Sequence, residues 1–274
     1  MTPTFSKTLG PISARFIEQM LVNGKTIFNL DDAATVYGKE RKKTTQFLSD
    51  LVKRGVLARI KAGVYLIFQA GQANSQLDNW AIIARALTGS ADYYISHYSA
   101  MRLHGMTTHA AREVTVTLSK RCARKTLHHL TYRFIYAKPA HFWGYSTHWV
   151  TKQEKVFVSD IERTLLDAFE RPDLCIGIPE VTRGLWVKQK EIDWRKLVRY
   201  AKKFHTIAAI KRLGFILELL DLGAECVSSL LKITTPAKDY IFLDPTEPKA
   251  GRCVSRWRVR LNVNGDALKA SVWE

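Results

Sequence analysis

Basic and amide side chains follow one another closely between residues 39 and 53, and their chemistry suits contact with nucleic acid. Lysine and arginine bind phosphate oxygens, whereas glutamine and threonine can hydrogen-bond to base edges. The candidate contact residues in this segment are Lys39, Arg41, Lys42, Lys43, Thr45, Gln46 and Lys53. Two further candidates, Arg59 and Lys61, follow within 10 residues in a segment that has the pattern of a β-hairpin.

Such side chains need a helix that holds them on its outer face. Residues 41–54 predict this helix, because apolar positions recur there at three- and four-residue steps opposite the polar face. The apolar stripe consists of Thr44, Leu48, Leu51 and Val52, with Phe47 at its edge. Gly55 is expected to end the helix in a left-handed conformation.

The surrounding segments complete a small domain. Residues 30–37 predict a helix that Asn29 caps and Gly38 ends, and residues 13–22 predict a helix before it. The earlier helix is expected to bury Phe16, Ile17, Met20 and Leu21. Two strands at 56–60 and 64–68 would form the wing of a winged helix-turn-helix, in which the helix at 41–54 reads the major groove. The simpler alternative is an amphipathic hairpin with a solvated lysine face, which explains neither the wing nor the terminal glycines.

The charge balance indicates a polyanionic partner. The chain has 274 residues with 42 basic and 25 acidic side chains, which gives a net charge of +17 and a pI near 9.8. Nucleic acid is the commonest partner of so basic a protein. The length favours two domains, and the polar stretch 69–77 is the expected linker. We therefore predict a DNA-binding domain at 1–76 and a second domain at 77–274, both with an excess of positive charge.

The cysteines favour a reducing compartment. Cys122, Cys175, Cys226 and Cys253 show neither metal-site nor disulfide spacing. The N-terminus has no signal-peptide pattern, and no apolar run reaches the length of a membrane span. We expect a cytoplasmic protein that has no metal, no cofactor and no membrane contact.

The second domain is predicted to contain an antiparallel sheet. Strand-like runs occur at 114–118, 130–137, 144–150 and 155–158, after helical patterns at 78–87 and 96–103. Between the first two runs lies the acid-free segment KRCARKTLHH, residues 120–129. As a loop, this segment is either a solvated turn or an arm that contacts phosphate. With the helices that follow, the fold class is α+β.

Helices are predicted at 178–189, 193–204 and 206–222. Two basic stripes occur in the later part of the chain. Arg195, Arg199 and Lys202, with Lys203, share one face of the second of these helices. Arg256, Arg258 and Arg260 alternate with apolar residues and so predict one face of a strand. Each stripe is either a solvent-exposed surface without a binding role or a second basic surface that binds DNA or RNA.

Ser159-Asp160-Ile161-Glu162 has the S-x-x-E form of a capping box and predicts the start of a helix that ends before Pro172. The string VSDIERTLLDAFERPDLCIGIPEVTRGL, residues 158–185, together with IKRLGFILELL, residues 210–220, resembles the C-terminal domain of AbiEi-type antitoxins from abortive-infection toxin–antitoxin systems. The basic helix and the GVYLI ending of the wing resemble the N-terminal domain of the same family.

This resemblance implies two activities. The N-terminal domain of such antitoxins represses its own operon by binding inverted repeats in double-stranded DNA. The C-terminal domain neutralises a nucleotidyltransferase-like toxin that is encoded next to it, and a stable complex with the toxin is not required. A stand-alone winged-helix regulator, whose second domain senses a ligand or dimerises, is the alternative.

A metal-dependent enzyme is the third hypothesis, because Asp160, Glu162 and Asp167 lie close together in sequence. It is the weakest, since the capping box accounts for Glu162 and Arg163 can pair with Asp167 at the i, i+4 spacing. The sequence also contains no phosphate-binding or nucleophile-elbow motif. We expect no catalytic residues.

Overall fold

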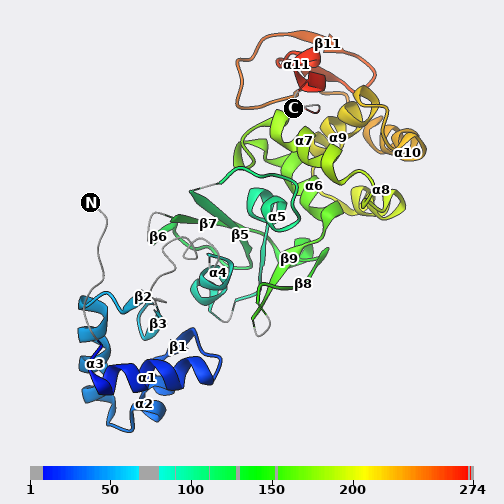
Figure 1. Ribbon diagram of the computed structural model, residues 1–274. Coiled ribbons are helices and arrows are strands. Elements are labelled where there is room, and N and C mark those ends of the chain that lie inside the picture. The colour runs from blue at the N-terminus through cyan, green and yellow to red at the C-terminus, as the bar shows by residue number, and fades with distance from the viewer. Residues whose placement is uncertain are drawn as a thin grey trace. The chain divides into compact units, whose positions relative to one another are not determined.

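A computed structural model describes residues 9–67, 80–89, 91–110, 112–127, 130–151, 154–270 and 272 (Figure 1). The chain divides into two compact units. Unit 1 comprises Met1–Ser90 with Trp149–Val156, and unit 2 comprises Ala91–His148 with Phe157–Glu274. The linker that the sequence predicts at 69–77 lies outside the described residues.

Unit 1 contains helices and a three-stranded antiparallel sheet whose strand order is β1-β3-β2. Its elements are α1 (Pro11–Val22), β1 (Ile27–Asn29), α2 (Leu30–Tyr37), α3 (Arg41–Lys53), β2 (Leu57–Lys61), β3 (Val64–Ile67) and α4 (Trp80–Thr88). Asn29 caps α2, because its side chain accepts hydrogen bonds from the main-chain N–H groups of Asp31 and Asp32. Gly38 adopts the left-handed conformation at the end of α2, with φ 68°. The expected helix ends are thus confirmed.

The core of unit 1 is aromatic and aliphatic. Phe16 contacts the rings of Phe28 and Phe47 edge to face, and the ring of Tyr37 stacks on Phe47 at 4.2 Å between centroids. Thr44, Leu48 and Leu51 of α3 are buried, as predicted, whereas Val52 is only partly buried. The prediction for Leu21 is wrong: α1 buries Ser13, Phe16 and Met20, and Leu21 lies on the exposed side.

Helix α4 also belongs to unit 1, together with the turn between β8 and β9. Arg85 of α4 donates hydrogen bonds to the Glu154 carboxylate and, at 2.7 Å, to the Lys155 carbonyl oxygen. Glu154 and Lys155 are therefore tied to a helix that precedes them by about 70 positions. A unit assembled from segments so far apart in sequence cannot be delimited by a single boundary along the chain.

Within the described residues, the larger sheet has six strands in the order β6-β7-β5-β4-β9-β8. These are β4 (Tyr93–Ile95), β5 (Glu113–Leu118), β6 (Lys125–Leu127), β7 (Leu130–Tyr136), β8 (Tyr145–Trp149) and β9 (Lys155–Ser159). The predicted antiparallel pairing is confirmed for β4 with β5 and for β6 with β7. The sheet as a whole is mixed, because β5 pairs with β7 in parallel, and so does β4 with β9. Strand β6 lies between β5 and β7 in sequence but pairs with the outer edge of β7, which lets β5 and β7 run the same way.

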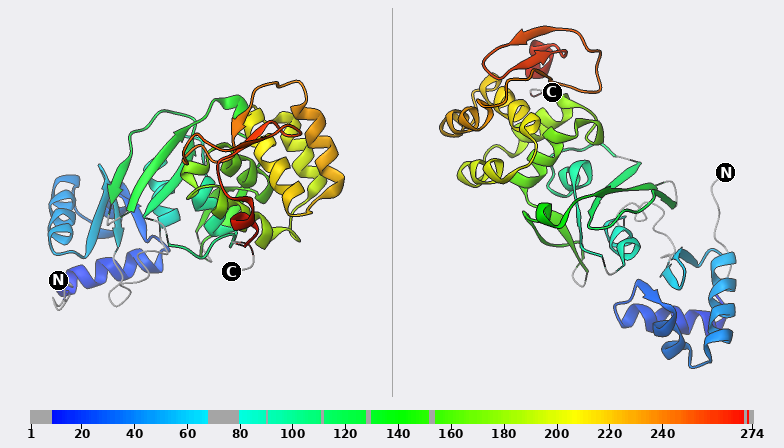
Figure 2. Two further views of the ribbon diagram at one scale, coloured as in Figure 1. Left: turned by 90° about the horizontal axis from the view of Figure 1, so that it is seen from above. Right: turned by 180° about the vertical axis from the view of Figure 1, so that it is seen from behind.

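Helices make up most of the rest of unit 2 (Figures 1 and 2). They are α5 (His97–Leu103), α6 (Ile161–Glu170), α7 (Ile178–Lys188), α8 (Trp194–Lys203), α9 (Ile207–Leu219) and α10 (Ala224–Thr234), with short 3₁₀ turns at Pro139–His141 and Pro172–Leu174. Helix α6 is the centre of this group, because it packs against α5, α7, α8 and α9. Its residues 162–169 are all buried.

The cap of α6 differs from the predicted capping box. Asp160 is the N-cap, and its carboxylate accepts a hydrogen bond from the main-chain N–H of Arg163 at 2.9 Å. The Ser159 hydroxyl instead lies within 2.7 Å of the Thr164 hydroxyl. Glu162 accepts the main-chain N–H of Asp193 at 2.9 Å, so it holds the start of α8 rather than the start of its own helix.

The C-terminal segment covers α9 (Figure 2). It contains β10 (Ile241–Phe242), β11 (Arg252–Val254), β12 (Val259–Leu261) and α11 (Gly265–Ala270). The indole of Trp257 is buried against Gly214, where a Cβ atom would lie 2.2 Å from the ring. The four cysteines are free, as expected. No helix among the described residues is long and apolar enough to cross a lipid bilayer.

Candidate nucleic-acid interface

The polar face of α3 is open to solvent over its whole length. Its first turn follows Glu40, and the buried stripe on the opposite face fixes its orientation against the core. The predicted contact residues that are exposed are Lys39, Arg41, Lys42, Lys43, Thr45, Gln46, Lys53 and Arg59. Lys61 is partly buried. The structure thus gathers most of the predicted residues on the outside of unit 1.

Three of these cations already have acidic partners. Arg41 contacts the Asp31 carboxylate, Lys43 lies 2.7 Å from Glu40, and Lys53 lies 3.8 Å from Asp50. Exposed pairs of this kind stabilise a fold by only about 0–1 kcal/mol, so a phosphate group can replace the carboxylate at little cost. These acids were not among the residues that the sequence pattern singled out. The i, i+3 spacing of Glu40 and Lys43 signals their pair, whereas nothing local links Asp31 to Arg41.

Three other cations have no acidic partner among the described residues. Lys39, Lys42 and Arg59 are exposed and form no ion pair with any described carboxylate. They are therefore free to neutralise phosphate without first losing an interaction. Binding through such side chains releases counterions and makes affinity depend on salt.

The two neutral candidates are engaged within α3. The Thr45 hydroxyl donates to the Arg41 carbonyl oxygen at 2.8 Å, and the Gln46 amide donates to Asp50 at 3.2 Å. Both bonds lie on the exposed side, where exchange with water or a base edge is easy. Gln46 can present its amide to a base once it releases Asp50.

The hairpin of β2 and β3 is pinned next to α2. Gly63 at its tip has φ 71°, a conformation that favours glycine, and its carbonyl oxygen accepts the main-chain N–H of Leu30 at 2.9 Å. The strand register shifts between Arg59 and Lys61. This irregularity lies beside the tip and separates the exposed Arg59 from the partly buried Lys61.

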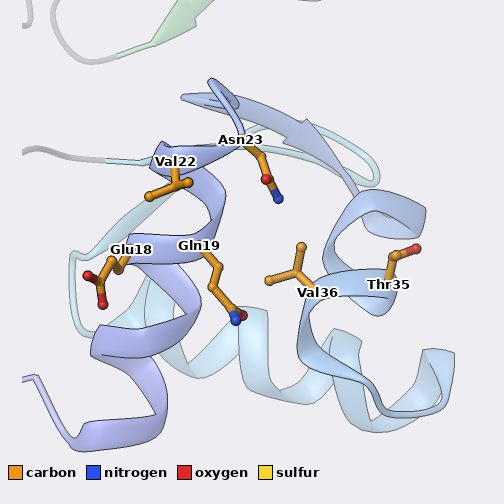
Figure 3. A pocket seen from close by; sticks show the side chains of 6 residues that line it. All are labelled: Glu18, Gln19, Val22, Asn23, Thr35 and Val36. Atoms are coloured by element: carbon orange, nitrogen blue, oxygen red, sulfur yellow. The ribbon is translucent and has the colours of Figure 1, made fainter.

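A hollow of about 440 Å³ lies between α1 and α2 (Figure 3). It is lined by Glu18, Gln19, Val22, Asn23, Thr35 and Val36. Gln19 of α1 and Val36 of α2 point toward each other across the gap, and none of the six is a predicted contact residue. The lining combines one carboxylate with amides and aliphatic groups and contains no nucleophile paired with a base, which is the arrangement that covalent catalysis requires.

The three acids of the enzyme hypothesis have structural partners. Asp160 accepts hydrogen bonds from the Tyr200 hydroxyl at 2.9 Å and from Lys196 at 3.1 Å, in addition to capping α6. Glu162 lies 2.7 Å from Lys196. Burial alone would lower the pKa of Lys196, but its hydrogen bonds to Glu162 and Asp160 raise that pKa to about 12. This cluster fastens α8 to α6.

The third acid is buried with its predicted partner. Arg163 Nε donates to Asp167 at 2.8 Å, and the guanidinium lies 4.3 Å from the centre of the Trp143 ring and 5.1 Å from that of Phe204. Arg163 Nη1 and Asp167 Oδ2 form no hydrogen bond with any residue that the structure describes. No group of three or more histidine, cysteine or carboxylate side chains placed to hold a metal ion occurs in the described part of the chain.

The first basic stripe of unit 2 forms as expected. Arg195, Arg199 and Lys202 are exposed on α8 and make no ion pair with a described carboxylate. Lys203 lies 4.7 Å from the centre of the Trp143 ring. Leu197 and Ala201 on the opposite face of α8 are buried, which directs the cations outward.

The second stripe does not form. The strand predicted across residues 256–261 is confirmed only at 259–261, which form β12; residues 255–258 make a turn between β11 and β12, and Arg258 has φ 51°. Arg256 bonds to Glu218 at 3.0 Å, Arg258 donates to the Thr235 and Ala237 carbonyl oxygens, and Arg260 lies over the Phe242 ring. The three guanidinium groups thus have separate local partners and do not form a row.

Comparison with known proteins supports the fold alone. No protein-family model matches the chain, and no curated protein matches it. Among solved structures, the crystal structure of the Rv2827c protein from Mycobacterium tuberculosis superposes with a TM-score of 0.70 over 98% of this chain and 97% of the other. Sequence identity is 12%. The α+β architecture of the whole chain is therefore one that a solved protein also has.

Proposed function

We propose that unit 1 is a winged helix-turn-helix that binds double-stranded DNA. In this proposal α3 enters the major groove, and the hairpin of β2 and β3 is the wing that contacts the adjacent backbone. The order of the elements, helix–strand–helix–helix–strand–strand, supports it. The observation that carries it is the exposed polar surface made by the outer face of α3 and the turn before it, where Lys42 of the helix and Lys39 of the turn form no ion pair with a described carboxylate.

We further propose that the protein is an autorepressor and an antitoxin. The support is the resemblance of residues 158–185 and 210–220 to AbiEi-type antitoxins, together with a net charge of +17. Unit 1 then represses the protein's own promoter by binding inverted repeats. Unit 2 neutralises a nucleotidyltransferase-like toxin without forming a stable complex, in the cytoplasm that both activities require.

Footprinting on the DNA upstream of the coding sequence tests the first activity. The full-length chain is the proper reagent, because a fragment that ends at residue 76 lacks α4 and the 149–156 segment of unit 1. We expect protection of inverted repeats that is lost when Arg41, Lys42 and Lys43 are replaced by alanine. Equal protection by the triple variant would show that α3 is not the recognition helix.

Growth rescue tests the second activity. An adjacent reading frame for a nucleotidyltransferase-like toxin separates the antitoxin from a stand-alone regulator. Co-expression with that gene's product should restore growth, and the R41A/K42A/K43A variant should rescue as well as the parent does. Failure of the parent to rescue would remove the antitoxin assignment and leave DNA binding unaffected.

A further inference from the structure

An exposed aromatic ring lies beneath an arginine at one end of the unit 2 sheet. Tyr136 is the last residue of β7 and is 45% exposed, and the guanidinium of Arg121 lies 5.5 Å from the centre of its ring. Tyr136 pairs in register with Leu118, the last residue of the parallel strand β5. The carboxyl ends of both strands therefore meet at this end of the sheet, whereas the edge strand β6 pairs with the first residues of β7 (Figure 1).

Further cations lie close in sequence to Arg121 or to Tyr136. The chain leaves β5 through residues 119–124, which include Lys120, Arg121 and Arg124, and leaves β7 through Lys138. Lys120, Arg124 and Lys138 are exposed and form no ion pair with a described carboxylate. We call the five residues Lys120, Arg121, Arg124, Tyr136 and Lys138 the Tyr136 platform.

Little acidic charge offsets the platform. The sequence contains no aspartate or glutamate from Val114 to Gln153. Glu113 pairs with Arg133 near the other end of β5, about 17 Å away at 3.3 Å per residue. Asp92 accepts the main-chain N–H of Ser119 through its carbonyl oxygen and so places one carboxylate near this end. The Asp92 carboxylate carries one negative charge, and the four lysine and arginine side chains of the platform carry four positive charges, so positive charge is in excess.

We propose that the Tyr136 platform binds single-stranded nucleic acid. A base stacks against the exposed Tyr136 ring and the planar guanidinium of Arg121, while Lys120, Arg124 and Lys138 neutralise the flanking phosphates. Aromatic rings in a basic groove bind single strands this way, with little dependence on base identity. A duplex does not fit this platform as well, because its bases already stack on one another and expose only their edges.

This site is separate from the DNA contact proposed for unit 1. It uses none of the α3 or hairpin residues, and it accounts for the acid-free segment 120–129, of which residues 120–127 are described. The sequence left that segment open between a solvated turn and an arm that contacts phosphate. The exposed ring beneath Arg121 favours a binding site, because a merely solvated turn has no need of a stacking surface.

Fluorescence anisotropy of the full-length protein tests the proposal. The probes are labelled 12-nucleotide single strands of thymidylate and of uridylate, and a duplex of the same length with a sequence absent from the protein's promoter. We expect Tyr136→Ala to weaken single-strand binding by about 5- to 150-fold, the range for losing one stacked base. Lys120→Ala should lower the salt slope by about 0.7, the value for one phosphate of a single strand.

Three controls separate this site from other causes. Tyr136→Phe keeps the ring and should bind as the parent does. Tyr240→Ala removes a tyrosine of matched exposure, 44%, from the C-terminal segment and should change nothing. The variant with Lys39, Lys42 and Arg59 replaced by alanine should keep single-strand binding, even where it loses promoter binding.

The outcomes decide the question. A preference for thymidylate or for uridylate identifies DNA or RNA as the physiological strand, and either one supports the site. Parent protein that binds neither strand, or Tyr136→Ala protein that is folded by circular dichroism and binds as the parent does, overturns the proposal. Loss of single-strand binding in the Lys39, Lys42 and Arg59 variant would reassign it to unit 1.

Discussion

Lys39, Lys42 and Arg59 are the cations on which DNA binding by unit 1 should depend most directly. They are exposed and, unlike Arg41, Lys43 and Lys53, form no ion pair with a carboxylate in the described part of the chain. Each phosphate contact contributes about 0.9 to the slope of log affinity against log salt on duplex DNA. Replacing all three by alanine should therefore flatten that slope by about 2.7.

The expected effect is large enough to measure. Between 50 and 200 mM salt, a slope difference of about 2.7 means that the parent loses about 40-fold more affinity for its promoter than the triple variant does. Titration of a labelled promoter fragment at four salt concentrations measures both slopes. The fold should be unaffected, because exposed lysine and arginine without partners contribute little to stability.

A matched control separates local contact from total charge. Replacing Lys190, Lys238 and Lys249 by alanine removes the same three charges from exposed positions of unit 2. This control should keep the parent's slope. If the control flattens the slope as much as the variant lacking Lys39, Lys42 and Arg59 does, the salt dependence reflects overall charge, and the inference that these three side chains contact phosphate is refuted.

Three further predictions concern stability, measured as the midpoint of urea unfolding. Asp160→Ala should destabilise unit 2 by about 1–3.5 kcal/mol, because it removes a helix cap and a hydrogen bond from Tyr200. Asp160→Asn should destabilise it less, because asparagine also caps helices. Equal losses in the two variants would contradict the assignment of Asp160 as the cap. Gly214→Ala should destabilise unit 2 by about 1–3 kcal/mol, since the added methyl group overlaps the Trp257 ring. A variant as stable as the parent would show that the ring has room to move. Burial, reinforced by nearby arginines, lowers the pKa of His97 from 6.5 to about 3. Between these two pH values the unfolded chain binds a proton that the folded chain does not bind. The free energy of unfolding should therefore fall as the pH drops below about 6.5, by up to about 1.4 kcal/mol per pH unit. His97→Asn, which tolerates the φ of 51° at this position, should lose less stability between pH 7 and pH 5 than the parent, and an equal loss would exclude His97 as the source.

The sequence by itself determined the elements of unit 1 that depend on local chemistry. Asn29 caps α2 through hydrogen bonds that reach two and three residues along the chain, and Gly38 ends it through its own backbone conformation. The buried stripe of α3 follows from a period of 3.6 residues and leaves the basic side chains outside. Such signals are complete within a few residues, so the helices, the hairpin and most of the candidate contact surface could be predicted.

Tertiary contacts decided what the local patterns left open or misstated. Ser159 has the right type and spacing for a cap, but its hydroxyl lies against that of Thr164, and its capping partner Glu162 holds the start of α8. The alternation from Arg256 to Arg260 has the period of a strand, yet Glu218 and the carbonyl oxygens of Thr235 and Ala237 hold the first residues in a turn.

The direction of strand pairing also lay beyond the sequence pattern. Strands β5 and β7 have the same alternation whether they run parallel or antiparallel, and only the placement of β6 on the outer edge of β7 fixes them as parallel. That placement brings the ends of β5 and β7 together and sets Arg121 over Tyr136, 15 residues later in the chain. A local pattern carries no information about partners at such separations, because which strand edge is free depends on the whole sheet.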